Sequence, residues 1–105
     1  YEKAEAEYKK ILKHYPKDRD AHFKLGVIYY KKGLIEKSSL EFMEVTSIDP
    51  KYSKAYYNMG TIFSSRGPYF DAQKATFCFQ KYLELEPATS HREKIELWLA
   101  KYRTK

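Results

Sequence analysis

Apolar residues recur along most of the chain at the three- and four-residue spacing of amphipathic helices. The first such segment covers residues 1–14, with one apolar side formed by Ala4, Tyr8, Ile11, Leu12 and Tyr15. The pattern predicts further helices over residues 19–32, 35–48, 53–66, 72–85 and 90–103. Prolines follow the first, third and fifth segments, at Pro16, Pro50 and Pro87. Because proline disfavours helical geometry in the residue before it, these segments have defined ends. We therefore expect an all-α protein.

The apolar pattern also repeats with a fixed period. A shift of 34 positions brings like residues together, pairing Ala21 with Ala55, Leu25 with Met59, Gly26 with Gly60, Tyr29 with Phe63 and Gly33 with Gly67. Beyond Gly67 the agreement resumes with a shift of 37, which pairs Phe42 with Phe79 and Pro50 with Pro87. A period of this size indicates a repeat architecture. An ordinary antiparallel bundle would explain the amphipathic segments but not their common register.

These residues resemble the tetratricopeptide repeat (TPR), a helix-turn-helix unit of 34 residues with Leu-Gly and Tyr in its first helix, Ala and Phe in its second, and Pro at its end. The central repeat supplies His22, Leu25, Gly26, Tyr29, Gly33, Ser38, Phe42, Val45 and Pro50. The next supplies Tyr56, Met59, Gly60, Phe63, Gly67, Ala75, Phe79, Tyr82 and Pro87. The resemblance covers nearly the whole chain. It implies a TPR-like α–α superhelix, a solenoid of antiparallel helix hairpins, with a C-terminal capping helix.

We expect residues 1–105 to form a single TPR-type domain, which the same register divides into four parts. We expect the second helix of a truncated repeat at 1–17, a full repeat at 19–52, a full repeat with a three-residue insertion at 53–87 and a capping helix at 89–104. Since the first segment corresponds to a second helix, we expect the chain to be an excerpt from a longer protein. The last helix carries Lys94-Ile95 in place of Leu-Gly and keeps one face polar, as a terminal cap does.

The repeated glycines have two expected roles. Gly26 and Gly60 fall in mid-helix, where glycine costs about 1 kcal/mol relative to alanine, so we expect the backbone of the paired helix to approach there. Gly33 and Gly67 suit the left-handed residue that ends a helix. On the second helix of the central repeat, we expect a buried side formed by Leu40, Phe42, Val45 and Ile48.

The insertion follows Gly67 and reads Pro68-Tyr69-Phe70-Asp71. Three extra residues fit either an extended helix or a bulged loop. Asp18 and Asp71 are suited to cap the helices that follow them. Tyr69 and Phe70 are interpreted as local packing, with a contact to a partner as the alternative.

Composition adds a basic surface without a specific nucleic-acid signal. The net charge is +6, but lysine and glutamate alternate along the helices, which is typical of a solvated, ion-paired face. We therefore expect no specific nucleic-acid binding. No run of about 18 apolar residues occurs, so no membrane span is expected.

No catalytic or metal-ligating constellation is present in the sequence. His14, His22 and His91 lie in different segments without metal-ligand spacing, and the latter two occupy packing positions of the repeat. The single cysteine, Cys78, sits between two phenylalanines, which favours a buried thiol over a nucleophile. We expect no enzymatic activity and no cofactor.

The resemblance to TPR proteins implies a binding groove lined by the first helices of the repeats. By carry-over, the groove residues are Phe23, Lys24, Val27, Tyr30 and Lys31 in the central repeat and Lys54, Tyr57, Asn58 and Thr61 in the next. Their aromatic and apolar members would form a floor, because aromatic side chains dominate interface hot spots. For Lys24 and Lys31, solvation of the surface is an equal alternative.

One subgroup of the family holds the C-terminal carboxylate of a chaperone with a set of lysines, asparagines and an arginine. Here only Asn58 matches that set. Phe23 and Val27 replace a lysine and an asparagine, and Thr89 and Glu93 replace a lysine and an arginine. A carboxylate clamp is therefore not expected.

The sequence thus predicts a non-catalytic scaffold that binds a protein or peptide, apolar or acidic in character, in the groove. The alternative is self-association into a homo-oligomer through the uncovered face of residues 1–14 and the Tyr69-Phe70 corner. A third, weaker alternative is a basic surface that docks on nucleic acid.

Overall fold

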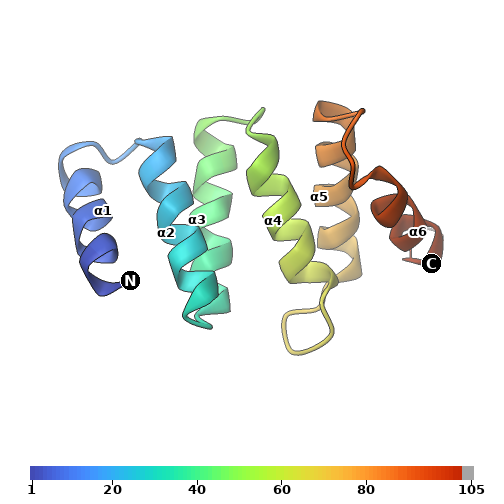
Figure 1. Ribbon diagram of the computed structural model, residues 1–105, viewed down its shortest axis with the longest axis horizontal. Helices are drawn as coiled ribbons and strands as arrows, with labels where there is room; N and C mark the ends of the chain where they lie inside the picture. The colour runs from blue at the N-terminus through green and yellow to red at the C-terminus, as the bar shows by residue number, and fades with distance from the viewer. Residues whose placement is uncertain (103–105) are drawn as a thin grey trace. The chain divides into compact units, whose positions relative to one another are not determined.

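The computed structural model describes residues 1–102, which contain α-helices and turns but no strand. The helices are α1 (Glu2–His14), α2 (Arg19–Lys31), α3 (Ile35–Ile48), α4 (Ser53–Ser64), α5 (Ala72–Leu85) and α6 (Arg92–Tyr102) (Figure 1). The predicted all-α class is confirmed, and each predicted boundary lies within two residues of the observed one. The predicted ends at residues 103 and 104 lie outside the described residues. No helix within residues 1–102 has the length and apolarity needed to cross a membrane.

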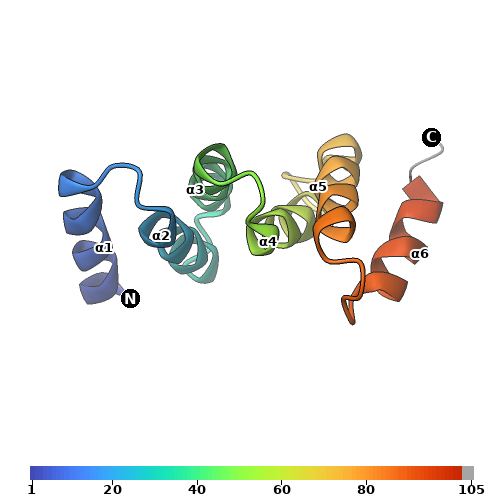
Figure 2. The same cartoon turned by 90° about the horizontal axis from the view of Figure 1, so that it is seen from above.

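The chain forms two compact units, Tyr1–Ala55 and Tyr56 onward. In the first unit α2 packs against both α1 and α3, and the three helices run side by side (Figures 1 and 2). The core of this unit is apolar and is formed by Ala21, Leu25, Ile28, Tyr29, Phe42 and Val45. None of the residues Glu2–His14 is buried. The apolar side of α1 is therefore only partly covered within the unit.

In the second unit α5 pairs with the part of α4 from Tyr56 onward, through the contact of Gly60 with Phe79, and α6 packs against α5. Its buried side chains are Tyr56, Met59, Ile62, Phe63, Ala75, Cys78, Phe79, Tyr82, Ile95 and Leu99. Trp98 is half-buried on α6 and contacts the ring of Phe79 edge-on, with 5.5 Å between ring centroids. It also stacks on Tyr102 at 4.6 Å. These contacts place Trp98 among the packing residues of the second unit.

The mid-helix glycines approach an aromatic ring of the paired helix. A β carbon built on Gly26 would lie 2.6 Å from a ring carbon of Phe42, and one built on Gly60 would lie 2.4 Å from a ring carbon of Phe79. The paired helix does come close at both glycines, but it does so with an aromatic side chain, so the expectation of a backbone approach is wrong. Backbone contact is mediated by Ser38, whose hydroxyl donates to the carbonyl oxygen of Gly26 at 2.7 Å.

The helix ends follow the predicted turn chemistry. Asp18 accepts a hydrogen bond from the amide of Ala21, and Asp71 accepts one from the amide of Lys74, so both predicted caps are confirmed. Gly33 has φ +80°, and the next amide, of Leu34, donates back to the carbonyl of Tyr29 at 2.8 Å. This is the glycine-terminated helix end that the sequence predicts.

The insertion forms a loop and not a longer helix. Helix α4 ends at Ser64, α5 begins at Ala72, and the amide of Asp71 donates to the carbonyl of Phe63 at 2.8 Å, which closes the loop. Gly67 has φ +134°, but it lies within the loop and does not end the helix directly. The loop interpretation is therefore correct, and the extended-helix alternative is wrong.

One predicted core residue lies on the surface. The side chain of Leu40 is 58% exposed, although Phe42 and Val45 on the same helix are buried as predicted. Ser38, Phe42 and Val45 mark the side of α3 that faces α2, and Leu40 lies two residues before Phe42, about 200° around the helix. The prediction for Leu40 is therefore wrong, because an apolar residue is buried on α3 only where its position around the helix faces α2.

Candidate partner-binding surface

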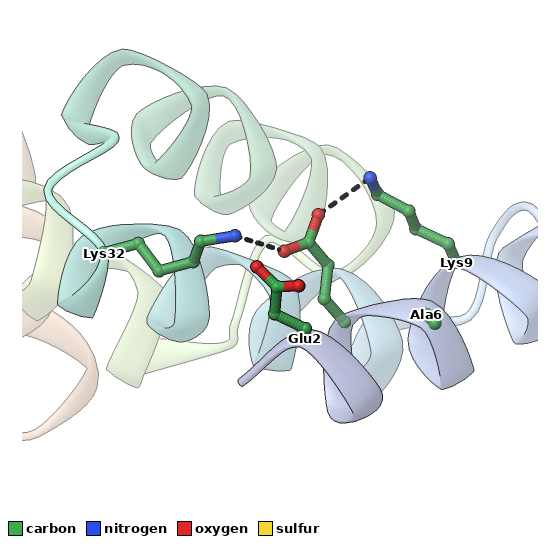
Figure 3. A pocket seen from close by; sticks show the side chains of 5 residues that line it. Glu2, Ala6, Lys9 and Lys32 are labelled. Atoms are coloured by element: carbon green, nitrogen blue, oxygen red, sulfur yellow. Dashed lines mark hydrogen bonds and ion pairs between the residues drawn. The ribbon is translucent and has the colours of Figure 1, made fainter.

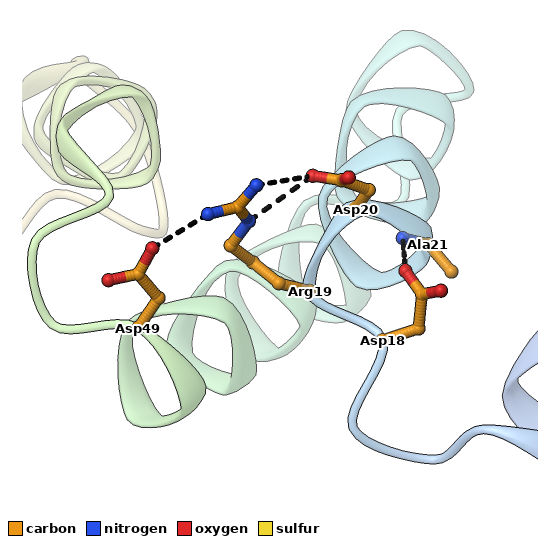
Figure 4. Close-up of polar contacts among 5 residues, drawn as sticks. All are labelled: Asp18, Arg19, Asp20, Ala21 and Asp49. Atoms are coloured by element: carbon orange, nitrogen blue, oxygen red, sulfur yellow. Dashed lines mark hydrogen bonds and ion pairs between the residues drawn. The ribbon is translucent and has the colours of Figure 1, made fainter.

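The first predicted surface lies on α2, in the first unit. The hydrogen bond from the amide of Ala21 to Asp18 fixes the start of this helix (Figure 4). Three residues at the spacing i, i+3 and i+7, namely Lys24, Val27 and Lys31, then fall on one side of it. The two lysines are exposed and Val27 is half-buried. Helix α2 thus presents two cations on either side of an apolar patch.

Lys24, Val27 and Lys31 form a row along α2, and two aromatic residues, Phe23 and Tyr30, lie beside it. Tyr30 is 44% exposed. Phe23 is half-buried, and its ring lies 5.5 Å from that of Phe42 and 5.2 Å from that of Tyr52, measured between centroids. Most of the Phe23 ring is therefore engaged in packing α2 against its own unit, whereas Tyr30 is open to contact from outside.

The second predicted surface lies on α4. Lys54 is exposed and belongs to the first unit. In the second unit Tyr57, Asn58 and Thr61 are half-buried. The Thr61 hydroxyl donates to the carbonyl oxygen of Tyr57 at 3.0 Å, which is a bond within the helix. Within the second unit Asn58 and Thr61, three residues apart, share a side of α4 with Tyr57, four residues before Thr61.

The ring of Tyr57 is largely occupied by its own unit. It stacks on His91 with a centroid distance of 4.5 Å and an interplanar angle of 26°, and it lies 5.1 Å from the ring of Tyr82. Its hydroxyl is 3.4 Å from Nδ1 of the same histidine. Tyr57 therefore packs the start of α6 onto the hairpin. His91 is accounted for by this packing, as expected for its position in the repeat.

Around the start of α2 the charges are satisfied internally. The guanidinium of Arg19 lies between two carboxylates, bonding Asp49 at 2.8 Å and Asp20 at 3.0 Å (Figure 4). It also covers the ring of Tyr52 at 4.4 Å. The hydrogen bond from Arg19, together with one from the amide of Lys51, lowers the pKa of Asp49 below its usual value. Arg19 is thus held by its own unit and is not available to a partner.

A second charged cluster joins α1 to α2 and was not anticipated from the sequence. The carboxylate of Glu5 accepts from Lys32 and from Lys9, each at 2.8 Å (Figure 3). The hydrogen bonds from Lys32 and then Lys9 lower the pKa of Glu5 to about 2. These residues line a shallow pocket of about 240 Å³ together with Glu2 and Ala6. The pair Glu5 and Lys9 is visible in the sequence as an i, i+4 pattern, but Lys32 is distant in sequence and gives no such signal.

The remaining candidate groups have structural roles. His22 bonds Glu41 and the carbonyl of Pro16, which links α2 to α3 and to the preceding turn. Cys78 is buried, and burial raises the pKa of its thiol to about 12, so the reactive thiolate is suppressed at neutral pH. Within residues 1–102 no group of three or more His, Cys, Asp and Glu side chains is placed to bind a metal ion.

The Tyr69-Phe70 corner belongs to the loop of the second unit. Both side chains are partly exposed, at 42% and 39%. The ring of Phe70 lies 5.6 Å from that of Tyr102 on α6. This contact supports the interpretation of Phe70 as local packing and leaves Tyr69 as the more open of the two.

Comparison with known families agrees with this geometry. Residues 20–52 match the family model described as Tetratricopeptide repeat. The matched segment covers α2 from its second residue and all of α3, the hairpin in which Gly26 packs against Phe42. Among curated proteins, none matches the chain significantly.

Proposed function

We propose that this chain, which contains a tetratricopeptide repeat, is a non-catalytic scaffold that binds a peptide or helix of a partner protein. Repeats of this family generally mediate protein–protein interaction and are not catalytic units. The single observation that carries the proposal is the exposed row on α2, where Lys24 and Lys31 flank Val27 and Tyr30 is 44% exposed. An exposed aromatic side chain offers a large contact area at a small cost in conformational freedom.

The residues on α4 form a second proposed contact surface. Asn58 is its most specific member, because an amide both donates to and accepts from a peptide backbone. The packing of Tyr57 against His91 leaves Asn58 and Thr61 as the polar part of this surface. We expect Asn58→Ala to weaken partner binding less than a change at Tyr30 does.

The test is affinity capture from native lysate with wild-type protein and a Tyr30→Glu variant. Tyr30 is preferred to Phe23 or Tyr57, since those rings pack within their own units and their replacement would also disturb this packing. Leu40→Glu is the matched control, because it places the same charge on an exposed apolar position of α3. We expect a protein retained by wild type and by the Leu40 variant but lost with Tyr30→Glu. Equal capture by all three proteins would contradict binding through α2.

Self-association is a second candidate, favoured by the apolar side of α1. On this helix Ile11 is 37% exposed, and Tyr15, which follows it, is 69% exposed. If a second copy covers this side, the mass measured by analytical ultracentrifugation should rise with concentration and Ile11→Glu should abolish the rise. A monomeric mass at all concentrations would exclude this candidate without affecting the first.

A further inference from the structure

The cations on helix α2, together with Lys32 directly after it, fall into two groups. Arg19 is paired with Asp20 and Asp49, and Lys32 is paired with Glu5, all at 2.8 to 3.0 Å (Figures 3 and 4). Lys24 and Lys31 are exposed, and neither forms an ion pair with a carboxylate among the described residues. Lys24 and Lys31 are therefore available to pair with acidic groups of a partner.

The local sequence explains why these two lysines have no internal partner. On a helix, ion pairs form between residues three or four apart. The only acidic residue at such a spacing from Lys24 is Asp20, and Arg19 already holds its carboxylate through two bonds, from Nε at 3.2 Å and Nη2 at 3.0 Å. Around Lys31 the corresponding positions are all apolar, namely Val27, Ile28, Leu34 and Ile35. In this arrangement neither lysine has a carboxylate of its own on α2.

The spacing of the row suits a particular ligand. Lys24 and Lys31 are seven residues apart, which corresponds to a rise of about 10.5 Å along one side of the helix. Val27 lies between them on the same side, and Tyr30 borders it. A second helix with carboxylates seven residues apart and an apolar side chain between them presents the complementary pattern at the same rise.

We propose that the row Lys24, Val27, Lys31, with Tyr30 beside it, binds an acidic amphipathic helix that carries two carboxylates seven residues apart on either side of an apolar residue. This inference rests on the proposed function and specifies the partner of the same surface. The two ion pairs select the register and charge of the ligand, and the apolar contact with Val27 and Tyr30 supplies the attraction that exposed ion pairs alone provide only weakly.

The probe is a fluorescently labelled, alanine-based helical peptide of about 15 residues, long enough to form a helix in part. It carries two glutamates seven residues apart, with a leucine three residues after the first. A second peptide of identical composition spaces the glutamates five residues apart, which places them on different sides of the helix. Fluorescence anisotropy should show the first peptide binding roughly fivefold tighter, the effect of two exposed ion pairs. Equal affinities would overturn the inference.

Charge reversal in the protein gives the second arm. The variant Lys24→Glu with Lys31→Glu should bind the glutamate peptide about tenfold more weakly, because like charges across an interface repel. It should in turn prefer a peptide with lysines in place of the glutamates. The matched control, Lys10→Glu with Lys13→Glu, makes the same change in net charge at exposed positions of α1 and should retain wild-type affinity. An equal loss in the control would show a non-specific effect of charge and contradict the proposal.

The outcomes also separate this inference from the proposed function. A lysate partner that depends on Tyr30 but is unaffected by reversal at Lys24 and Lys31 would overturn the acidic-helix inference and leave the scaffold function intact. Loss of that partner in both variants, together with the peptide preference, would support both.

Discussion

Replacing Gly26 with alanine is expected to destabilise the protein by about 1–3 kcal/mol, the usual cost of overpacking a core. In an open helix the same change would stabilise by about 1 kcal/mol, so the sign of the effect is diagnostic. The added β carbon would meet two ring carbons of Phe42, at 2.6 and 2.8 Å, and Phe42 is only 1% exposed, which leaves the ring no space to move away. The free energy of unfolding is measured by urea titration with far-UV circular dichroism.

A double-mutant cycle identifies the cause. Phe42→Leu removes the ring that the new methyl group would strike, so Gly26→Ala should cost less in the Phe42→Leu background than in wild type. Gly60→Ala, combined in the same way with Phe79→Leu, is the equivalent test in the second unit, where the β carbon would lie 2.4 Å from the ring. Strictly additive costs in both pairs would refute the steric explanation.

The elements that the sequence predicted correctly depend on local or periodic signals. The positions of Pro16, Pro50 and Pro87 limit α1, α3 and α5, each of which ends two residues before its proline. The repeat register, lengthened to 37 by the three-residue insertion, matched Phe42 to Phe79, and both pack against the glycine of their paired helix. These signals come from a few residues, prolines that restrict the backbone and glycines that leave space for a ring, which allow only one local structure.

The predictions that failed or remained incomplete depend on helical phase and on contacts distant in sequence. Leu40 was expected to be buried because it is apolar, yet its direction on α3 leads it outward. The Glu5–Lys32 pair joins residues 27 positions apart, and no spacing rule connects them. The stacking of Tyr57 on His91 was missed for the same reason. A periodic pattern places a residue on a side of a helix, but it does not tell which neighbour covers that side.

The sequence predicted the candidate surface only in part. The groove positions of the family, transferred to this sequence, gave nine candidate residues. They did not separate the residues that pack within their unit from those that stay exposed. The structure makes this distinction at Phe23, which contacts Phe42 and Tyr52, and at Tyr30, which stays 44% exposed. The distinction determines which substitution tests binding without unfolding the protein.

His22 is expected to make stability depend on pH in the neutral range. Its Nε2 lies 2.8 Å from the carbonyl oxygen of Pro16 and its Nδ1 lies 2.7 Å from a carboxylate oxygen of Glu41. A carbonyl and a carboxylate are both acceptors, so both ring nitrogens donate only when the imidazole is protonated. A neutral ring that donates to Pro16 would direct a lone pair at the carboxylate. The geometry therefore favours the imidazolium form.

The charges around the ring act in the same direction. Burial opposes the charged form, but the hydrogen bonds to Glu41 and Pro16 and the negative charges of Glu41 and Glu44 on α3 outweigh it, so the pKa of His22 is raised above its ordinary value. A pKa that is higher in the folded than in the unfolded state stabilises the fold fully below the unfolded value, near 6.5. That contribution is lost as the pH rises through the folded pKa.

The free energy of unfolding of wild type should therefore fall, relative to a His22→Gln variant, as the pH is raised from about 6 to about 8. The comparison with the variant removes the contributions of His14 and His91, which both proteins share. NMR titration of the imidazole protons should give a pKa of His22 above its ordinary value. In a Glu41→Gln variant the pKa of His22 should drop. Burial still opposes the charged form, and only the hydrogen bond to Pro16 and the charge of Glu44 then favour it. A pKa of His22 that is unchanged by Glu41→Gln would show that the carboxylate does not hold the imidazolium, and the pH dependence would need another source.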